Sequence, residues 1–252
     1  MSEQAGVTAR TGVSEVPGDY RYAGSELALF AQALRWKAYW ARTLRRFVSG
    51  SVLDVGAGIG SNVAVLLSPQ VRSWVALEPD HALVDDMQAS LASHALPALC
   101  QPMAGTLADL PGGAMFDTIL YIDVMEHIAD DRAEAVLAAA HLTPGGRLIV
   151  LVPAHQYLFS AFDTAIGHYR RYNRRSLLAL APPGCRLEFF RMLDSVGFFA
   201  SLANRLLLRA ALPSAGQIRL WDRVMVPISV CLDPLLGYRF GKTAVAVWTR
   251  AP

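Results

Sequence analysis

The feature that most constrains this chain is a glycine-rich turn that joins a short apolar run to a helical segment. Residues 53–62 read LDVGAGIGSN, with glycines at Gly56, Gly58 and Gly60. Glycines let a backbone approach a ligand closely, and the first turn of the helix that follows offers unpaired N–H groups. In a dinucleotide fingerprint the third glycine would stand one residue later, at Ser61, and a triphosphate-binding loop would end in Gly-Lys-Ser or Gly-Lys-Thr. The turn therefore predicts a ligand site and weighs against NAD, FAD and nucleoside triphosphates.

A carboxylate follows at a spacing that suits a nucleoside site. Glu78 stands 18 residues after Gly60, at the end of the next apolar run. A carboxylate in that place can accept both hydroxyls of a ribose. Because the turn lacks phosphate-binding features, the pair predicts an unphosphorylated nucleoside.

Short apolar runs alternate with helical stretches along the chain, which predicts a parallel sheet with helices on both faces. The predicted strands cover residues 51–55, 74–77, 118–122, 147–152, 186–192 and 243–249. Ahead of them, apolar residues at three-and-four spacing predict one amphipathic helix from Ser25 to about Val48, with Ser25 as its cap. Residues 195–240 are predicted to form a variable helical insertion before the last strand.

Composition bounds the class of protein. The 252 residues carry 23 lysines and arginines against 21 acidic residues, too even a balance for a protein that mainly coats nucleic acid. Residues 1–24 lack an apolar core, so they predict a flexible lead rather than a signal peptide. Three isolated cysteines favour a reducing, cytoplasmic setting.

The hydrophobic content of 53% exceeds what the core of an ordinary domain requires. No stretch reaches about 18 uncharged apolar residues, which argues against a membrane span. The apolar segment 198–238 leaves three uses open: the wall of an apolar pocket, the face of a homodimer, or contact with a membrane surface. A monomer and a homodimer are both compatible with the sequence.

Together these features resemble the class I S-adenosylmethionine-dependent methyltransferases, from about Trp36 to Trp248. Residues 116–128, FDTILYIDVMEHI, resemble the family's fourth strand and its V-L-E-H-I segment, with Met125 in place of leucine. Residues 142–148, LTPGGRL, resemble the Pro-Gly-Gly turn before its fifth strand. The resemblance implies an α/β, Rossmann-like class I methyltransferase fold. Its seven-stranded, mostly parallel sheet would form one domain over residues 25–252.

The resemblance also implies which residues bind S-adenosylmethionine. The three glycines would line its methionine and ribose portions, Asp54 would lie near its amino group, and Glu78 would bind the ribose diol. Thr106 departs from the Gly-Asp pair that commonly contacts adenine, whereas Asp123 falls at the mouth of the sheet, where open α/β folds bind ligands. The predicted cofactor-binding residues are Asp54, Gly56, Ala57, Gly58, Gly60, Asn62, Glu78, Pro79, Thr106, Leu107, Asp123 and Val124.

The acceptor side is predicted from residues 155–180, which in this family commonly close over the acceptor. Residues 167–172, GHYRRY, resemble a stretch of uncharacterised bacterial methyltransferases that are often encoded with envelope or secondary-metabolite enzymes. Arginines beside tyrosines can bind an anion, or they can pair with carboxylates of the protein itself. The candidates for catalysis are His127, His155 and His168, and those for acceptor binding are Tyr157, Tyr169, Arg170 and Arg171.

Glu126 and His127 have two interpretations. They can simply begin and pack the next helix. Asp123-x-x-Glu126-His127 also resembles an arrangement with which quinone-pathway O-methyltransferases of this family hold a divalent cation. The cation is the minority interpretation, so no metal ligand is predicted.

The sequence as a whole predicts an S-adenosylmethionine-dependent methyltransferase. The sulfonium carbon of that cofactor is already electrophilic, so the protein has mainly to align the acceptor. The expected acceptor is a small, partly apolar metabolite, which can be anionic, and O-methylation is the leading prediction. The alternatives are N- or C-methylation, a non-methylating step in the same fold, an NAD-dependent oxidoreductase and a nucleic-acid methyltransferase.

Overall fold

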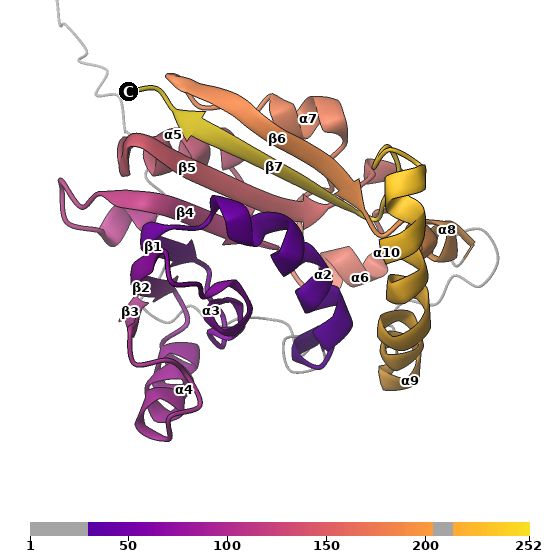
Figure 1. The fold of residues 1–252 in the computed structure, drawn as a ribbon, viewed down its shortest axis with the longest axis horizontal. Helices are drawn as coiled ribbons and strands as arrows, with labels where there is room; N and C mark the ends of the chain where they lie inside the picture. Colours follow the sequence, from indigo (N-terminus) through magenta and orange to yellow (C-terminus); the bar gives the residue numbers. More distant parts are fainter. Residues whose placement is uncertain (1–29, 204–213) are drawn as a thin grey trace, which may run out of the picture.

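The structure is a computed structural model that describes residues 30–203 and 214–252 (Figure 1). The predicted lead, residues 1–24, lies outside the described residues. The strands are β1 (Gly50–Val55), β2 (Val71–Glu78), β3 (Cys100–Ala104), β4 (Phe116–Ile122), β5 (Leu142–Pro153), β6 (Cys185–Leu193) and β7 (Thr243–Arg250). The α-helices are α2 (Leu34–Leu44), α3 (Ser61–Leu66), α4 (His81–Ala92), α5 (Asp131–Ala140), α6 (Ala161–Ala165), α7 (Arg174–Leu178), α8 (Ser195–Ala203), α9 (Ala215–Leu220) and α10 (Val226–Leu235).

The strands form one seven-stranded sheet in the order β3-β2-β1-β4-β5-β7-β6. β1 to β5 pair in parallel, and β7 runs antiparallel to both of its neighbours, β5 and β6. The chain winds outward from β1 to β3 and then returns to place β4 beside β1. The loops after β1 and β4 therefore meet at a topological switch point, where open α/β sheets bind ligands. The predicted Rossmann-like, mostly parallel sheet is confirmed.

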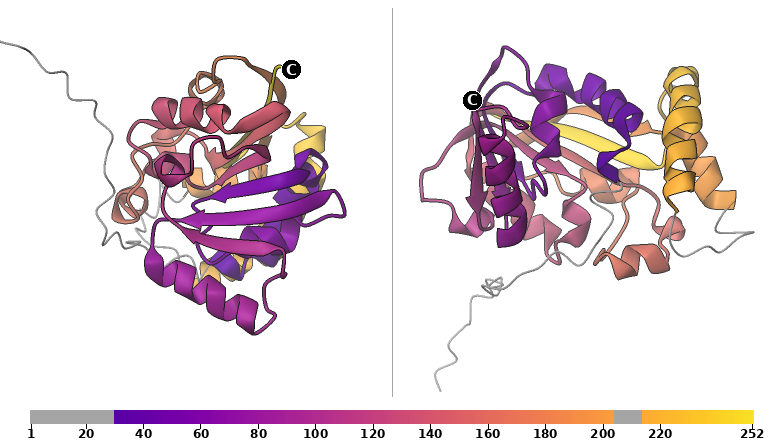
Figure 2. Two further views of the ribbon diagram at one scale, coloured as in Figure 1. Left: turned by 90° about the vertical axis from the view of Figure 1, so that its left-hand side faces the viewer. Right: turned by 90° about the horizontal axis from the view of Figure 1, so that it is seen from below.

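Helices cover both faces of the sheet, so the core has two halves (Figure 2). Strand residues alternate between them: Val52 packs on the side of α2, α3 and α4, and Leu53 packs on the side of α5 and α7. Central strands such as β4 and β7 are buried almost throughout because both of their faces are covered. This burial explains why they read as continuous apolar runs.

The N-terminal helix differs from the prediction. Instead of one helix from Ser25 to Val48, the described part has a break at Gln32 and Ala33, after which α2 begins at Leu34. The backbone N–H of Trp36 donates to Asp222 Oδ1 at 2.9 Å, so a carboxylate far along the chain satisfies the start of α2. Ser25 lies outside the described residues. The apolar spacing predicted the buried face of α2 but not its beginning.

The third strand was not among the strands predicted from apolar runs. β3 lies at the edge of the sheet and contains Pro102, and its residues are mostly only partly buried. A proline is tolerated in an edge strand, because one side of that strand has no partner to which an N–H must donate. The resemblance implied seven strands, and the edge position explains why the pattern showed six.

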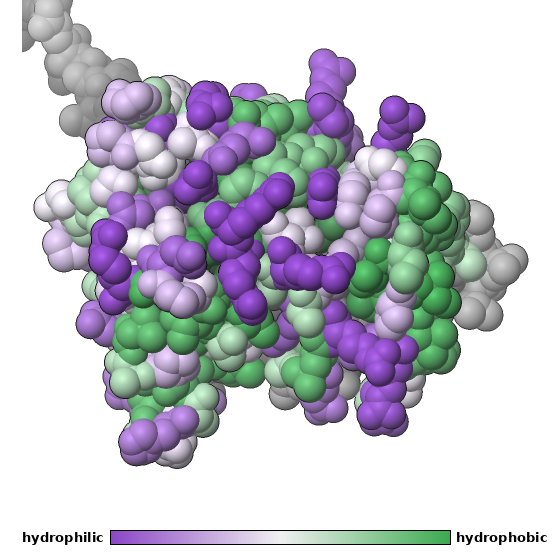
Figure 3. Space-filling view, viewed as in Figure 1, coloured by the Kyte–Doolittle hydropathy of each residue, from purple (hydrophilic) through white to green (hydrophobic). Residues whose placement is uncertain are grey.

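The helical insertion before β7 is present, with α8 and α10 at the far end of the sheet (Figure 1). A turn of π-helix, η6 (Trp221–Met225), joins α9 to α10. Four apolar side chains remain exposed along the continuous helical segment of α9, η6 and α10, namely Leu220, Val224, Ile228 and Leu235. Figure 3 shows apolar surface over the same segment. Among the residues that the structure describes, no helix has the length and apolar character needed to cross a membrane.

Candidate active site

The glycine turn follows β1 directly and holds three left-handed backbone positions. Gly56, Gly58 and Gly60 have φ of 64°, 59° and 74°, a region in which residues with a Cβ are strained. A Cβ on Gly56 would lie 2.7 Å from Val124 Cγ2, so the loops after β1 and β4 touch at this glycine. Gly60 precedes α3, where it packs against Met87. A side chain at Gly56 or Gly60 would therefore collide with neighbouring side chains, so the turn can follow this path only with glycine at these positions.

Glu78, the last residue of β2, is bound into this turn. Its Oε2 accepts the backbone N–H of Gly58 at 2.8 Å, and its Oε1 accepts the N–H of Asp80 at 3.0 Å. The side chain is only 4% exposed, and burial raises the pKa of the carboxyl while the two backbone hydrogen bonds lower it. Since an ionised carboxylate offers about four acceptor positions, two remain for further hydroxyl donors.

Asp54 lies beneath the turn rather than on its open side. It is fully buried, and Asn62 Nδ2 donates to its two carboxylate oxygens at 3.1 and 3.3 Å. Burial raises the pKa of Asp54 to about 7, although the bond from Asn62 acts in the opposite direction. Asp54 and Asn62 thus join β1 to the first turn of α3, and direct contact of either with the cofactor stays a prediction.

The predicted adenine side lies after β3. Gly105 donates its N–H to the carbonyl of Glu78 at 3.0 Å, which places the loop beside the β2 acid. The Thr106 hydroxyl donates to Asp109 Oδ2 at 2.8 Å in the cap of the short helix η2 (Leu107–Asp109), and the Leu107 side chain is buried in the core. Pro79 and Ala57 lie in the adjoining turns, partly buried and buried respectively. Contact of these residues with an adenine ring stays a prediction.

Asp123 follows β4 at the switch point in a left-handed conformation, with φ of 55°. Its side chain is open to solvent, yet the surrounding protein raises its pKa to about 6 while the charges of His168, Lys242 and Lys37 lower it. The sequence contains two lysines, and both act on this one carboxyl. One of these lysines lies in α2 and the other just before β7, so two segments far apart in the sequence contribute positive charge near Asp123. Sequence reasoning missed both lysines, and their rarity was the available signal.

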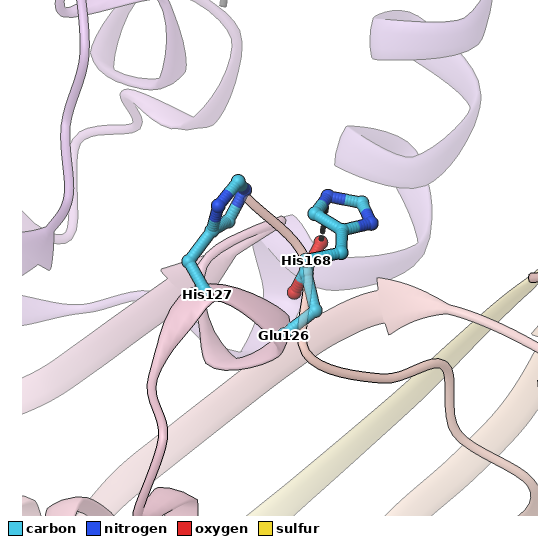
Figure 4. A group of neighbouring side chains, drawn as sticks. All are labelled: Glu126, His127 and His168. Atoms are coloured by element: carbon cyan, nitrogen blue, oxygen red, sulfur yellow. Dashed lines mark ion pairs between the residues drawn. The ribbon is translucent and has the colours of Figure 1, made fainter. Parts of the chain in front are cut away.

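Two predicted catalytic histidines come together beside Glu126. The rings of His127 and His168 lie 4.5 Å apart between centroids at an angle of 85°, and His168 Nε2 lies 3.8 Å from Glu126 Oε1 (Figure 4). Burial raises the pKa of Glu126 well above its usual range and lowers that of His127 to about 4. Glu126 and His127 belong to the short helix η3 (Met125–His127), whereas the next α-helix, α5, begins only at Asp131 with Asp130 as its cap.

His155 belongs to a different group of side chains. Its Nε2 lies 3.0 Å from the carbonyl oxygen of Gly241, and its ring packs against Tyr157 and Phe198 at centroid distances of 5.1 and 4.8 Å. Burial lowers the pKa of His155. Phe198, from α8, was not among the predicted site residues because only the tertiary fold brings the insertion to this loop. Tyr157 is half exposed and offers an aromatic surface to solvent.

The arginine run is engaged with carboxylates of the protein. Arg171 Nε donates to Asp163 Oδ1 at 2.7 Å, and Arg170 pairs with Asp131 at 2.7 Å. Tyr169 is exposed beside Arg170, whose guanidinium lies 5.6 Å from its ring. This pairing is the structural role considered for the run, and binding of an anion by Arg170 or Arg171 stays a prediction. Asp163 was missed as a central residue of this segment.

Comparison with known proteins identifies the family. A family model described as a methyltransferase domain matches residues 29–191, so the chain belongs to that family, and its fold is that of the class I S-adenosylmethionine-dependent methyltransferases. No curated protein matches the chain in sequence.

Solved structures share the fold at low identity. The cyclase SpnF has a TM-score of 0.59 at 17% identity over 87% of this chain and 82% of its own. Coclaurine N-methyltransferase, bound to N-methylheliamine and SAH, has a TM-score of 0.59 at 11% identity, over 86% of this chain and 72% of its own. Mitomycin 7-O-methyltransferase MmcR has a TM-score of 0.55 at 15% identity, over 89% of this chain and 55% of its own. Their names cover three kinds of reaction, so the shared fold does not by itself determine the chemistry.

Proposed function

We propose that this chain transfers a methyl group from S-adenosylmethionine to a small, partly apolar acceptor, with oxygen as the acceptor atom. The observation that carries the proposal is the position of Glu78, whose carboxylate accepts the N–H of Gly58 and keeps two acceptor positions unused. Glu78 ends β2 and Asp123 follows β4, so both lie at the carboxyl-terminal end of the parallel strands. A nucleoside and a reacting group can lie side by side along such an edge.

The residues of the turn fit the cofactor. Glu78 has the capacity to accept ribose hydroxyls, because two of its acceptor positions are not used by Gly58 and Asp80. When bound, S-adenosylmethionine supplies an electrophilic methyl group on a positively charged sulfur. The protein then has to exclude water and hold the acceptor oxygen in line with the carbon–sulfur bond.

The acceptor side is proposed to lie between Asp123 and the aromatic group of His155, Tyr157 and Phe198. The aromatic rings suit an apolar portion of the acceptor, and Lys37 and Lys242 suit an anionic portion. As the oxygen–carbon bond forms, a hydroxyl acceptor must lose its proton to a nearby base. His127, His155 and His168 remain the proposed proton acceptors, and a carboxylate acceptor would require none of them.

The test is transfer of isotope-labelled methyl from S-adenosylmethionine into fractionated extract, with the Glu78→Ala variant alongside. Label that follows the wild type into one fraction and is lost with Glu78→Ala supports the proposal. Glu188→Ala, which removes an acid paired with Arg147 at the far sheet edge, is the matched control and should label the same fraction. Tight cofactor binding without label in any fraction would contradict methyl transfer to a constituent of that extract.

The lysines allow a second test of acceptor chemistry. Lys37→Met and Lys242→Met should each raise the KM for an anionic acceptor and leave S-adenosylhomocysteine affinity within about twofold. An unchanged KM in both variants would remove the lysines from acceptor binding and favour a neutral acceptor.

A non-methylating reaction is the second candidate, favoured by the structural likeness to the cyclase SpnF. In that case the chain would bind S-adenosylmethionine without consuming it. Product analysis separates the two, because methyl transfer forms one S-adenosylhomocysteine for each product molecule. N- and C-methylation are separated from O-methylation by the position of the label in the product.

A further inference from the structure

Three side chains from two distant segments converge beside the switch point. Glu126, His127 and His168 each offer a ligand atom, and these atoms lie within 4.8 Å of one another. Figure 4 shows the Glu126 carboxylate directed toward the His168 ring, with the His127 ring to one side. Two imidazoles and one carboxylate are a recurrent ligand set for divalent transition metals.

Backbone hydrogen bonds hold the two segments together. The N–H of Tyr169 donates to the carbonyl of Glu126 at 2.8 Å, and the N–H of His168 donates to the carbonyl of Asp163 at 2.8 Å. A Cβ on Gly167 would lie 3.8 Å from His127 Nδ1, so the same loop also passes the second histidine. The cluster is therefore built into the fold and does not depend on long, freely rotating side chains.

Glu126 is the unexplained member of this cluster. Its side chain is fully buried, and neither carboxylate oxygen has a hydrogen-bond partner in another described residue. Buried polar groups nearly always have a partner, and an unpaired buried carboxylate is especially costly. The nearest candidate, His168 Nε2, lies 3.8 Å from Oε1, which is too far for a hydrogen bond. Something else is needed between these two atoms.

The contacts on the opposite side of the His168 ring restrict which group can lie between His168 Nε2 and Glu126. His168 Nδ1 lies 2.9 Å from Asp163 Oδ1, and Asp163 also accepts from Arg171 and from the Ser160 hydroxyl. An Nδ1–H that donates to this carboxylate leaves a lone pair on Nε2, facing Glu126. A carboxylate that orients a histidine in this way is the usual outer partner of a metal-binding imidazole.

We propose that Glu126, His127 and His168 bind a divalent transition-metal ion, with Asp163 as the positioning residue behind His168. In a tetrahedral site with bonds of about 2.1 Å, two ligand atoms lie about 3.4 Å apart, close to the 3.8 Å between His168 Nε2 and Glu126 Oε1. Two nitrogen ligands favour Zn²⁺, Mn²⁺ or Fe²⁺ over Mg²⁺, which prefers oxygen. Binding of the ion does not depend on the proposed methyl transfer, and with an ion bound His155 is the one of the three proposed histidines that can still accept a proton from the acceptor.

The test is a direct binding measurement on tag-free full-length protein after removal of bound metal with a chelator. Zn²⁺ and Mn²⁺ are titrated separately, by calorimetry and by equilibrium dialysis. The wild type is expected to bind one ion per chain, and Glu126→Gln and His168→Asn should each weaken binding at least tenfold. Asn is chosen at position 168 because its amide can still donate to Asp163 in place of Nδ1. Asp163→Asn should weaken binding about 10- to 100-fold.

His94→Asn is the matched control. His94 is exposed and has φ of 61°, a conformation that Asn tolerates, so this variant removes one surface imidazole at little cost. It should bind metal like the wild type, and circular dichroism should confirm that every variant is folded. Absence of stoichiometric binding to the wild type would overturn the proposal, as would equal binding by folded Glu126→Gln and His168→Asn. Displacement by Mg²⁺ as effective as by Mn²⁺ would also overturn it.

Discussion

The Glu78 carboxylate accepts the backbone N–H of Gly58 at 2.8 Å, although the two residues stand 20 positions apart. The contact exists because β1 and β2 are parallel neighbours, with Val55 paired to Leu77, so the residues that follow both strands emerge at the same edge. It turns a spacing in the sequence into one candidate nucleoside site, and several consequences of this arrangement can be measured.

Replacement of Glu78 tests the nucleoside site directly. Glu78→Ala should raise the Kd for S-adenosylhomocysteine roughly 10- to 100-fold, because hydrogen bonds to a charged acceptor contribute about 1.5–3 kcal/mol. Calorimetric titration of S-adenosylhomocysteine measures it, with Glu188→Ala as the control that should bind normally. An affinity for Glu78→Ala within twofold of the wild type would remove Glu78 from the site.

Gly56 should tolerate no side chain. Gly56→Ala would place a Cβ 2.7 Å from Val124 Cγ2 at a φ of 64°, so both a clash and backbone strain are expected. Adding Val124→Ala should relieve the clash and leave the strain, about 1–2 kcal/mol for a left-handed residue. Urea denaturation measures the loss of stability in the single and double variants, and cofactor titration measures the effect of the distorted turn on binding. Gly112→Ala, where an added Cβ meets nothing within 4 Å, should be neutral, and equal losses at both glycines would contradict the argument.

Burial of Asp54 predicts a pH-dependent loss of stability. Its pKa is about 7 in the folded chain, against 3.8 as the ordinary value, so between about pH 4 and 7 the folded state holds a proton that the unfolded state has lost. The free energy of unfolding should therefore fall as pH rises through this range, by an amount on the order of 4 kcal/mol.

Asp54→Asn is the variant that isolates this effect. Asn is uncharged, nearly isosteric, and can still accept a hydrogen bond from Asn62, so its stability should lack that contribution. Between pH 4 and 7 the free energy of unfolding of the wild type should fall relative to that of Asp54→Asn. Above pH 7 the difference between the two proteins should stay constant. A difference independent of pH, measured by urea denaturation, would show that Asp54 is not held in the acid form.

The pair Arg171–Asp163 should be structural. Burial alone would raise the pKa of Asp163, but hydrogen bonds from His168 and Arg171 hold this pKa well below its usual range. Arg171→Ala leaves that buried carboxylate without its arginine partner and should cost about 3 kcal/mol of unfolding free energy. Arg72→Ala removes a partner of Asp117 from an exposed pair and should cost less than about 1 kcal/mol. Urea denaturation compares the two, and equal small losses would return Arg171 to the candidates for anion binding.

Features with local causes were predictable from sequence. The turn at Gly56, Gly58 and Gly60 and the acid at Glu78 were recognisable because backbone conformation and strand ends are encoded within a few residues. The buried strands were recognisable because both faces of a central strand require apolar side chains. The edge strand with Pro102 was not, because its half-exposed residues carry little pattern.

The candidate site was only partly predictable for the same reason. His127, His155 and His168 were singled out one by one, but nothing in their spacing indicated that His168 joins Glu126 and His127 while His155 packs on Phe198. Lys37 and Lys242 lie near opposite ends of the chain, and Asp123 brings them into one electrostatic group.

By itself, the sequence determined the fold class and the glycine turn after the first strand, since short-range apolar periodicity and glycine geometry indicate both. Only the tertiary structure decided where α2 begins, through Asp222, and which acids, histidines and lysines surround the switch point. Those contacts join segments that are far apart along the chain. They depend on which strands become neighbours in the sheet, and no local pattern carries that information.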